Sequence, residues 1–188
     1  DVGYTRELDE ALCLLQAGKK VLLNPDWKKI TGIEGKFVPV FWSPVHFPKQ
    51  AGTMGLLCDP KHPVFASFPT EGHTDWQWWD LQIRSTTMLV DQIKGGKALV
   101  EMIDNFANNR KLASIFEGSV GKGKLIVVSF DLATDLNNRP VARQMLQSIL
   151  TYMNSSRFAP KVIENPEVLQ KILQYKEPQE KAAPVAIY

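Results

Sequence analysis

Hydrophobic residues near the start of the chain recur at the spacing of an amphipathic helix. Leu8, Leu12 and Leu15 fall on one side of such a helix, which we expect to end at Gly18, a residue that favours helix C-termini. The short apolar run Val21–Leu23 follows closely and has the length of a buried strand. A helix followed at once by a strand is typical of α/β proteins.

The second half of the chain shows a more regular pattern. Three apolar runs, Lys97–Ile103, Lys111–Phe116 and Lys124–Phe130, are separated by polar turns and predict three strands, the last two forming a hairpin. Within the third run, Leu125–Val128 is apolar without alternation, which indicates a strand covered on both faces. Pro140–Met153 carries an apolar stripe at helical spacing and begins with a proline, which suits a first helical turn.

The middle and the end of the chain are less regular. Prolines and glycines are frequent over Ser43–Glu71, which predicts a long excursion of the kind that is often functional or packs on a partner. Val168–Tyr175 predicts a weaker helix, and residues 176–184 lack a core-forming pattern. We therefore expect one domain over residues 1–160, followed by a C-terminal helix and a mobile tail over residues 161–188.

Composition and charge narrow the classes of partner. The chain has 188 residues, of which 44% are hydrophobic and 22% charged, and these are values of globular proteins. The net charge is only +2, and no block of five or six like charges provides the basic stripe of nucleic-acid-binding proteins. No run approaches the roughly eighteen apolar residues of a transmembrane helix. We expect neither a nucleic-acid nor a membrane partner, and no motif predicts a cofactor.

The segment His73–Asp80 carries the richest functional signal, because it holds three of the chain's five tryptophans. If it is helical, Trp76 and Trp79 share one face and Trp78 points elsewhere. Tryptophan serves either as a core anchor or as a contact surface with an apolar face and one N–H donor. The candidate contact residues, for a carbohydrate or for a neighbouring domain, are His73, Asp75, Trp76, Trp78, Trp79 and Asp80.

Several strings of the chain resemble the C-terminal region of family 2 glycoside hydrolases, the β-galactosidase-like enzymes of Bacteroides-type bacteria. The resemblance implies a three-layer α/β domain of the flavodoxin or class I glutamine amidotransferase type, with a mostly parallel sheet. Because Asp1 stands almost at the first predicted helix, we expect the first strand of that fold to be absent or to lie in a preceding domain. The strings are Phe41–Gln50, Gly55–Pro63, Phe68–Asp80, Leu136–Gln144 and Leu150–Met153.

The resemblance also implies a role for the chain. It places the family's catalytic barrel upstream, and 188 residues without eight βα units cannot contain that barrel. We therefore expect a non-catalytic accessory domain of a glycoside hydrolase, with no catalytic residue of its own. Its partners would be the upstream domains of the same polypeptide, and its location periplasmic or secreted.

Two alternative functions stay open. In the first, the chain is a carbohydrate-binding module in which a ring of Trp76–Trp79 stacks on a sugar, while Asp75, Gln77 or Asp80 binds its hydroxyl groups. In the second, it is a hydrolase or amidotransferase with Cys58 as nucleophile and a nearby histidine as base. The residues after Cys58 are Asp and Pro rather than the small residues of a nucleophile turn, which weakens the second alternative.

The remaining cysteine and the histidines give no further site. Cys13 falls on the apolar side of the first predicted helix, and we expect it to be buried as a small hydrophobic residue. His46, His62 and His73 match no spacing of zinc ligands, so no metal site is predicted.

Overall fold

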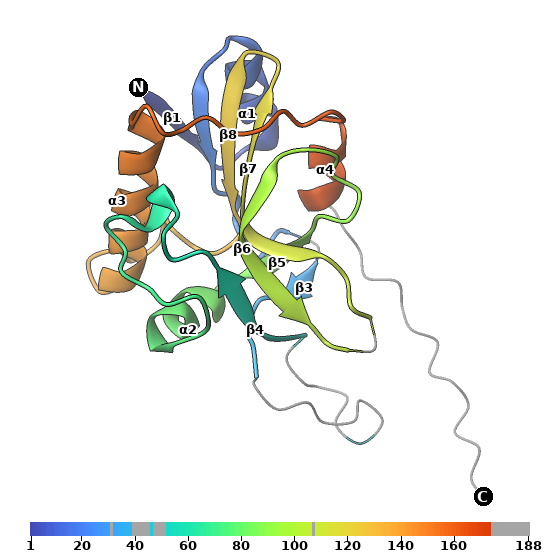
Figure 1. Cartoon of the computed structure of the whole chain (residues 1–188), viewed down its shortest axis with the longest axis vertical. Coiled ribbons are helices and arrows are strands. Elements are labelled where there is room, and N and C mark those ends of the chain that lie inside the picture. Colours follow the sequence, from blue (N-terminus) through green and yellow to red (C-terminus); the bar gives the residue numbers. More distant parts are fainter. Residues whose placement is uncertain (31, 39–45, 47–51, 107, 174–188) are drawn as a thin grey trace, which may run out of the picture.

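The computed structural model describes residues 1–30, 32–38, 46, 52–106 and 108–173, and these build one mixed sheet of eight strands. The strand order is β1-β2-β8-β7-β5-β3, and β4 joins through β6, which also pairs with β7 (Figure 1). The strands are β1 (Val2–Thr5), β2 (Lys20–Leu23), β3 (Ile33–Glu34), β4 (Thr53–Cys58), β5 (Thr86–Leu89), β6 (Lys97–Asp104), β7 (Leu112–Val120) and β8 (Gly123–Val128).

Helices cover both faces of this sheet (Figure 1). Three of them pack on one face, where the larger hydrophobic cluster lies, and two pack on the other. On the first face lie η1 (Pro63–Phe65), α2 (Trp76–Gln82) and α3 (Pro140–Asn154), and on the second lie α1 (Leu8–Gln16) and α4 (Val168–Leu173).

The pairing of the strands overturns the expected fold class. Among the strands that the structure describes, only β1 with β2 and β2 with β8 pair in parallel, whereas the five other pairings are antiparallel. The flavodoxin or amidotransferase-like fold with a mostly parallel sheet is therefore wrong. The physical reason is connection length: β7 reaches β8 through a two-residue turn, and a parallel pair needs a crossover of a dozen or more residues.

The expectation of a missing first strand is also wrong. Val2–Thr5 forms β1 and pairs in parallel with β2, with Val2 opposite Lys20 and Thr5 opposite Leu23. Helix α1 provides the crossover between the two strands. The strand has only four residues, yet they are enough for a strand at the edge of a sheet.

Other local predictions are confirmed. The first helix ends near Gly18, which has a φ of +77°, and the β7–β8 hairpin and the proline-led helix α3 both form where expected. Strand β8 is covered on both faces, since Ile126 and Val128 lie in the larger cluster and Leu125 and Val127 in the smaller one.

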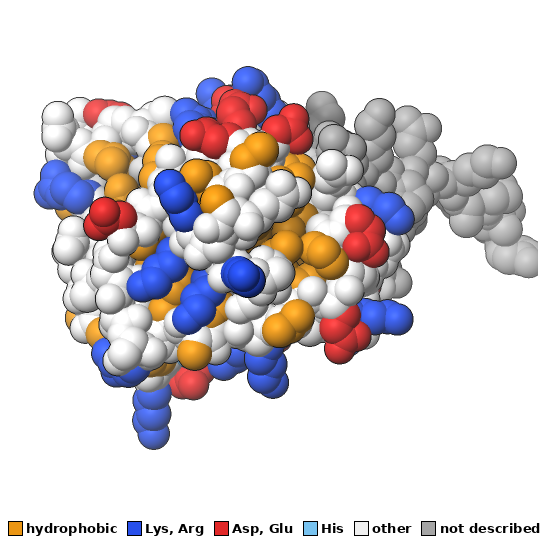
Figure 2. All heavy atoms as spheres, turned by 90° about the horizontal axis from the view of Figure 1, so that it is seen from above, with side chains coloured by type: hydrophobic (Ala, Val, Ile, Leu, Met, Phe, Trp, Pro, Cys, Tyr) orange, Lys and Arg blue, Asp and Glu red, His pale blue; other side chains and the backbone are white. Residues whose placement is uncertain are grey.

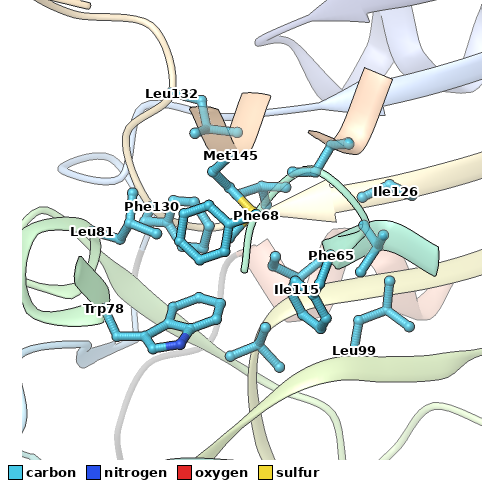
Figure 3. Close-up of a cluster of buried hydrophobic side chains, with 14 of the residues drawn as sticks. Phe65, Phe68, Trp78, Leu81, Leu99, Ile115, Ile126, Phe130, Leu132 and Met145 are labelled. Atoms are coloured by element: carbon cyan, nitrogen blue, oxygen red, sulfur yellow. The ribbon is translucent and has the colours of Figure 1, made fainter. Parts of the chain in front are cut away.

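The larger cluster is rich in aromatic rings. Figure 3 shows Phe65, Phe68 and Trp78 beside Phe130 and Met145, so that residues from η1, α2, α3 and the sheet meet in one place. At the C-terminal end of the described residues, α4 packs into the smaller cluster. The division of the chain at residue 160 stays a prediction, and the expected tail lies outside the described residues.

The buried side-chain amide of Asn24 connects the carboxyl ends of the parallel strands through hydrogen bonds. Asn24, which is 1% exposed, donates from Nδ2 to the carbonyl oxygens of Val128 at 2.9 Å and Phe130 at 2.8 Å. Its Oδ1 accepts from the backbone N–H of Leu132 and from the hydroxyl of Tyr4, both at 3.1 Å. The four bonds join the residue after β2 to β1, to the last residue of β8 and to the segment that follows β8, so this side chain sets the geometry of that edge.

Replacing this amide should therefore be costly. We expect Asn24→Ala to lower the free energy of unfolding by about 2–4 kcal/mol, because it leaves buried backbone groups without partners. Urea denaturation measures the change, with Asn137→Ala, at an exposed turn residue, as the matched control. A loss for Asn24→Ala no larger than that of the control would show that the amide does not hold this edge.

Candidate functional site

The tryptophan segment begins with a capped helix. Asp75 has extended backbone angles, and its Oδ1 accepts from the backbone N–H of Trp78 at 3.0 Å, which is the bond of an N-cap residue. Its Oδ2 accepts from the side-chain amide of Gln77 at 3.3 Å, and that amide also donates to the carbonyl of Pro69 at 2.7 Å. The carboxylate of Asp75 and the amide nitrogen of Gln77 are therefore already engaged in hydrogen bonds within the protein.

Trp78 is a core anchor. Its side chain is 0% exposed and makes edge-to-face contacts with Phe65 and Phe68, at centroid distances of 5.9 and 5.4 Å. The indole N–H donates to the hydroxyl of Thr70 at 2.7 Å, so the buried ring has its polar group satisfied. Figure 3 shows the ring directed into the larger cluster.

Trp76 and Trp79 belong to a separate surface hollow and its rim, which we call the Trp76 shelf. Trp76 is 85% exposed, while Trp79 is half-buried with its ring edge-on to Phe37 at 5.3 Å. The helical spacing predicted that these two rings share a face, and both line the same open hollow of about 450 Å³. The lining of the Trp76 shelf is Phe37, Val38, Thr74, Asp75, Trp76 and Trp79.

His73 and Asp80 do not line this hollow. The imidazole of His73 is exposed and lies 2.9 Å from the carboxylate of Glu71, which is itself exposed, so the pair is a solvated surface contact. Asp80 has one buried carboxylate oxygen without a hydrogen-bond partner, and its charge acts on Arg139. Of the six residues proposed from sequence, the structure brings Asp75, Trp76 and Trp79 together and places Trp78 in the core.

The environment of Cys58 disfavours a nucleophilic role. Burial raises the pKa of this thiol to about 11, although a hydrogen bond with Thr70 opposes the shift, and Sγ donates to the carbonyl of Glu71 at 3.4 Å. His62 and Cys58 line one surface hollow. However, Nδ1 of His62 accepts from the backbone N–H of Val64, and its Nε2 faces Glu117 at 4.0 Å. Both ring nitrogens of this candidate base are therefore directed to other groups.

Sequence reasoning missed a buried polar network around Glu117. This carboxylate in β7 is 5% exposed and accepts from the hydroxyl of Tyr152 in α3 at 2.8 Å. Burial raises the pKa of Glu117, although the Tyr152 hydrogen bond opposes the shift, and burial lowers the pKa of His62. A lone charged residue inside an otherwise uncharged strand was the available signal.

No metal or membrane feature stands out in the part of the chain that the structure describes. No group of three or more His, Cys, Asp or Glu side chains there is arranged to hold a metal ion. None of the described helices has the length and apolar character needed to cross a bilayer.

The two faces of α2 predict opposite outcomes for tryptophan replacement. We expect Trp78→Ala to destabilise the protein by about 3–5 kcal/mol, because it opens a cavity among aromatic rings. Trp76→Ala should change stability by no more than about 0.5 kcal/mol, since its ring is in water. Chemical denaturation of both variants checks this, and equal losses would contradict the division of the helix into a core face and a shelf.

The two thiols should differ in alkylation. Cys13 is exposed, which corrects the expectation that it is buried: it falls on the outer side of α1. With a pKa of about 11, roughly one Cys58 thiol in a thousand is ionised at pH 8. Iodoacetamide labelling followed by peptide mapping should therefore modify Cys58 about a hundredfold more slowly than a free cysteine, with Cys13 as the internal control. Rapid labelling of Cys58 at pH 6 would contradict this prediction and support Cys58 as a catalytic nucleophile.

Comparison with known proteins adds one match. A family model described as a domain of unknown function (DUF8487) matches residues 3–174, a span that includes the Trp76 shelf and nearly all of the sheet. Comparison with curated proteins gives no match. The match covers well over half of the chain, and the chain therefore belongs to the DUF8487 family.

Proposed function

We propose that the chain is a non-catalytic accessory domain of a family 2 glycoside hydrolase of the β-galactosidase-like kind, and that it docks on the upstream domains of the same polypeptide through the Trp76 shelf. The observation that carries this proposal is the 85% exposure of Trp76 beside the half-buried ring of Trp79. An indole buries about 150–250 Å² when covered, which at about 25 cal/mol per Å² contributes at most about 4–6 kcal/mol. A partner surface that covers this ring gains a large contact from one residue.

The chemistry of the described residues supports a role without catalysis. Glycoside hydrolysis needs two carboxyl groups that flank the scissile bond, and among the described residues the only carboxylate that lines the Trp76 shelf is Asp75. That carboxylate caps α2 through Trp78 and also accepts from Gln77. Cys58 has a raised pKa, and both ring nitrogens of the neighbouring His62 are directed at other groups. The sequence resemblance to the C-terminal region of these enzymes supports the proposed class of the parent enzyme.

Carbohydrate binding is the second candidate, and the exposed flat ring of Trp76 favours it. A sugar platform also needs polar groups at its rim that are free to bind hydroxyls. The Asp75 carboxylate of this shelf is bonded within the chain, and so is the amide nitrogen of Gln77, which follows Trp76 in the sequence. We therefore rank a protein surface above a sugar as the occupant of the Trp76 shelf.

A binding experiment separates the two candidates. The region encoded upstream in the same reading frame is produced separately, and its affinity for the chain is measured by calorimetry. We expect Trp76→Ser to weaken binding at least tenfold, whereas Val162→Ser, which alters a 61% exposed hydrophobic residue outside the shelf, leaves it unchanged. Galactose and oligosaccharides should leave the intrinsic fluorescence of the chain unchanged.

Two outcomes would overturn the proposal. A reading frame without a family 2 catalytic region, or binding that Trp76→Ser leaves intact, would remove the accessory role through this shelf. A saturable fluorescence change with a glycan, lost in Trp76→Ser at unchanged melting temperature, would assign the shelf to carbohydrate binding instead.

A further inference from the structure

The parallel part of the sheet creates a second candidate site, independent of the Trp76 shelf. Strands β1, β2 and β8 are neighbours and run in the same direction, so their carboxyl ends meet at one edge. Helix α1, which follows β1, covers one face of the sheet, and α3, which follows β8, covers the other. In open α/β sheets, the crevice where connections leave toward opposite faces is the usual position for a ligand.

A polar hollow of about 340 Å³ lies at this edge. The loop after β1 contributes one residue, the loop after β2 three and the loop after β8 two, and a further residue precedes β5. The lining residues are Arg6, Asp26, Trp27, Lys28, Arg84, Asp131 and Thr134.

The two carboxylates of the hollow already have partners. Asp131 accepts at Oδ1 from the backbone N–H groups of Ala133 and Thr134, at 2.9 and 3.0 Å, and its Oδ2 lies 3.2 Å from Nη1 of Arg139. Burial raises the pKa of Asp131, but the hydrogen bond from the Thr134 hydroxyl, the two backbone bonds and the Arg139 charge outweigh it, so the pKa is lowered and the group is ionised. Asp26 lies 3.9 Å from Arg6 and accepts from the backbone N–H of Lys28 at 3.1 Å.

Two cations of the hollow have no such partner. Among the described residues, no carboxylate lies within ion-pair distance of Arg84, and Lys28 has only the ring of its neighbour Trp27, at 5.7 Å. Behind Asp131 and Thr134 lies Arg139, 4% exposed, which donates to the carbonyls of both. Its Nε and Nη2 are buried and have no partner among the described residues. The lining of the hollow itself thus holds three cations, Arg6, Lys28 and Arg84, against two carboxylates, Asp26 and Asp131.

We propose that this hollow binds a small ligand through a carboxylate or phosphate group, with Arg84 and Lys28 as its counter-ions. A guanidinium offers two parallel donors to such a planar or tetrahedral oxyanion, and the ammonium of Lys28 adds a point charge. The indole of Trp27 lines the same hollow and gives the uncharged part of the ligand an apolar contact. The two sources of the anionic group, a small carboxylic acid or a phosphorylated compound, share this recognition chemistry.

Calorimetric titration with glucuronate and with inorganic phosphate tests the site, and glucose serves as the uncharged probe. We expect at least one of the two anions to bind saturably and glucose not to bind. Arg84→Gln should weaken anion binding about tenfold or more, and Lys28→Gln severalfold, because each removes a counter-ion. Higher ionic strength should weaken the binding further.

The matched control is Lys122→Gln in the β7–β8 turn, at the opposite end of β8. Figure 2 looks onto the molecule from above the view of Figure 1, and on that face lysine, arginine, acidic and hydrophobic side chains are intermixed. We expect the control to bind the anion like the unmodified chain.

Three results would overturn the proposal: no saturable binding of either anion, binding that both Arg84→Gln and Lys28→Gln leave unchanged, or an equal loss in Lys122→Gln. Should Arg84→Gln fail to fold, the exposed Lys28→Gln still decides the question. Glucuronate binding without phosphate binding would identify the carboxylate source, and the reverse result the phosphate source. None of these measurements involves the Trp76 shelf, so the two proposals can fail separately.

Discussion

Strand β8 has to be covered by hydrophobic side chains on both faces, and the arrangement of the other elements follows from that requirement. Ile126 and Val128 point into the cluster under α2 and α3, while Leu125 and Val127 point into the cluster under α1 and α4. At one edge β8 pairs in parallel with β2, and at the other it pairs antiparallel with β7. It is therefore the strand at which the parallel and antiparallel parts of the sheet meet.

This position divides the molecule into two regions with different functional potential. The parallel strands gather their carboxyl ends, and the loops that follow them bring Arg6, Lys28 and Asp131 to one edge although they are distant in sequence. Asn24 fixes these loops relative to one another through its four hydrogen bonds. The Trp76 shelf instead depends on α2, whose position is set by packing on the other face of the sheet.

Local signals in the sequence predicted the elements whose ends are marked by a glycine or a proline. Gly18 marks the end of α1, Pro140 marks the start of α3, and the glycine-containing turn before β8 marks a hairpin. The direction of strand pairing was not predictable in the same way, because an apolar run looks alike in parallel and antiparallel sheets. Strand β1 was missed because its sequence, Val-Gly-Tyr-Thr, lacks a continuous apolar run. The hollow at the carboxyl edge was missed because its residues come from separate loops.

The exposure of Trp76 follows from the geometry of a short amphipathic helix. Helix α2 has seven residues, and its buried residues Trp78 and Leu81 face the core. On a helix, a position two residues before Trp78 lies about 200° around the axis, so Trp76 points away from that core. The fold therefore gains nothing in its own packing from an indole at this position. An exposed ring of this size, bordered by Phe37, Val38 and Trp79, becomes favourable when a second surface covers it, and this is the physical basis for treating the shelf as a contact surface.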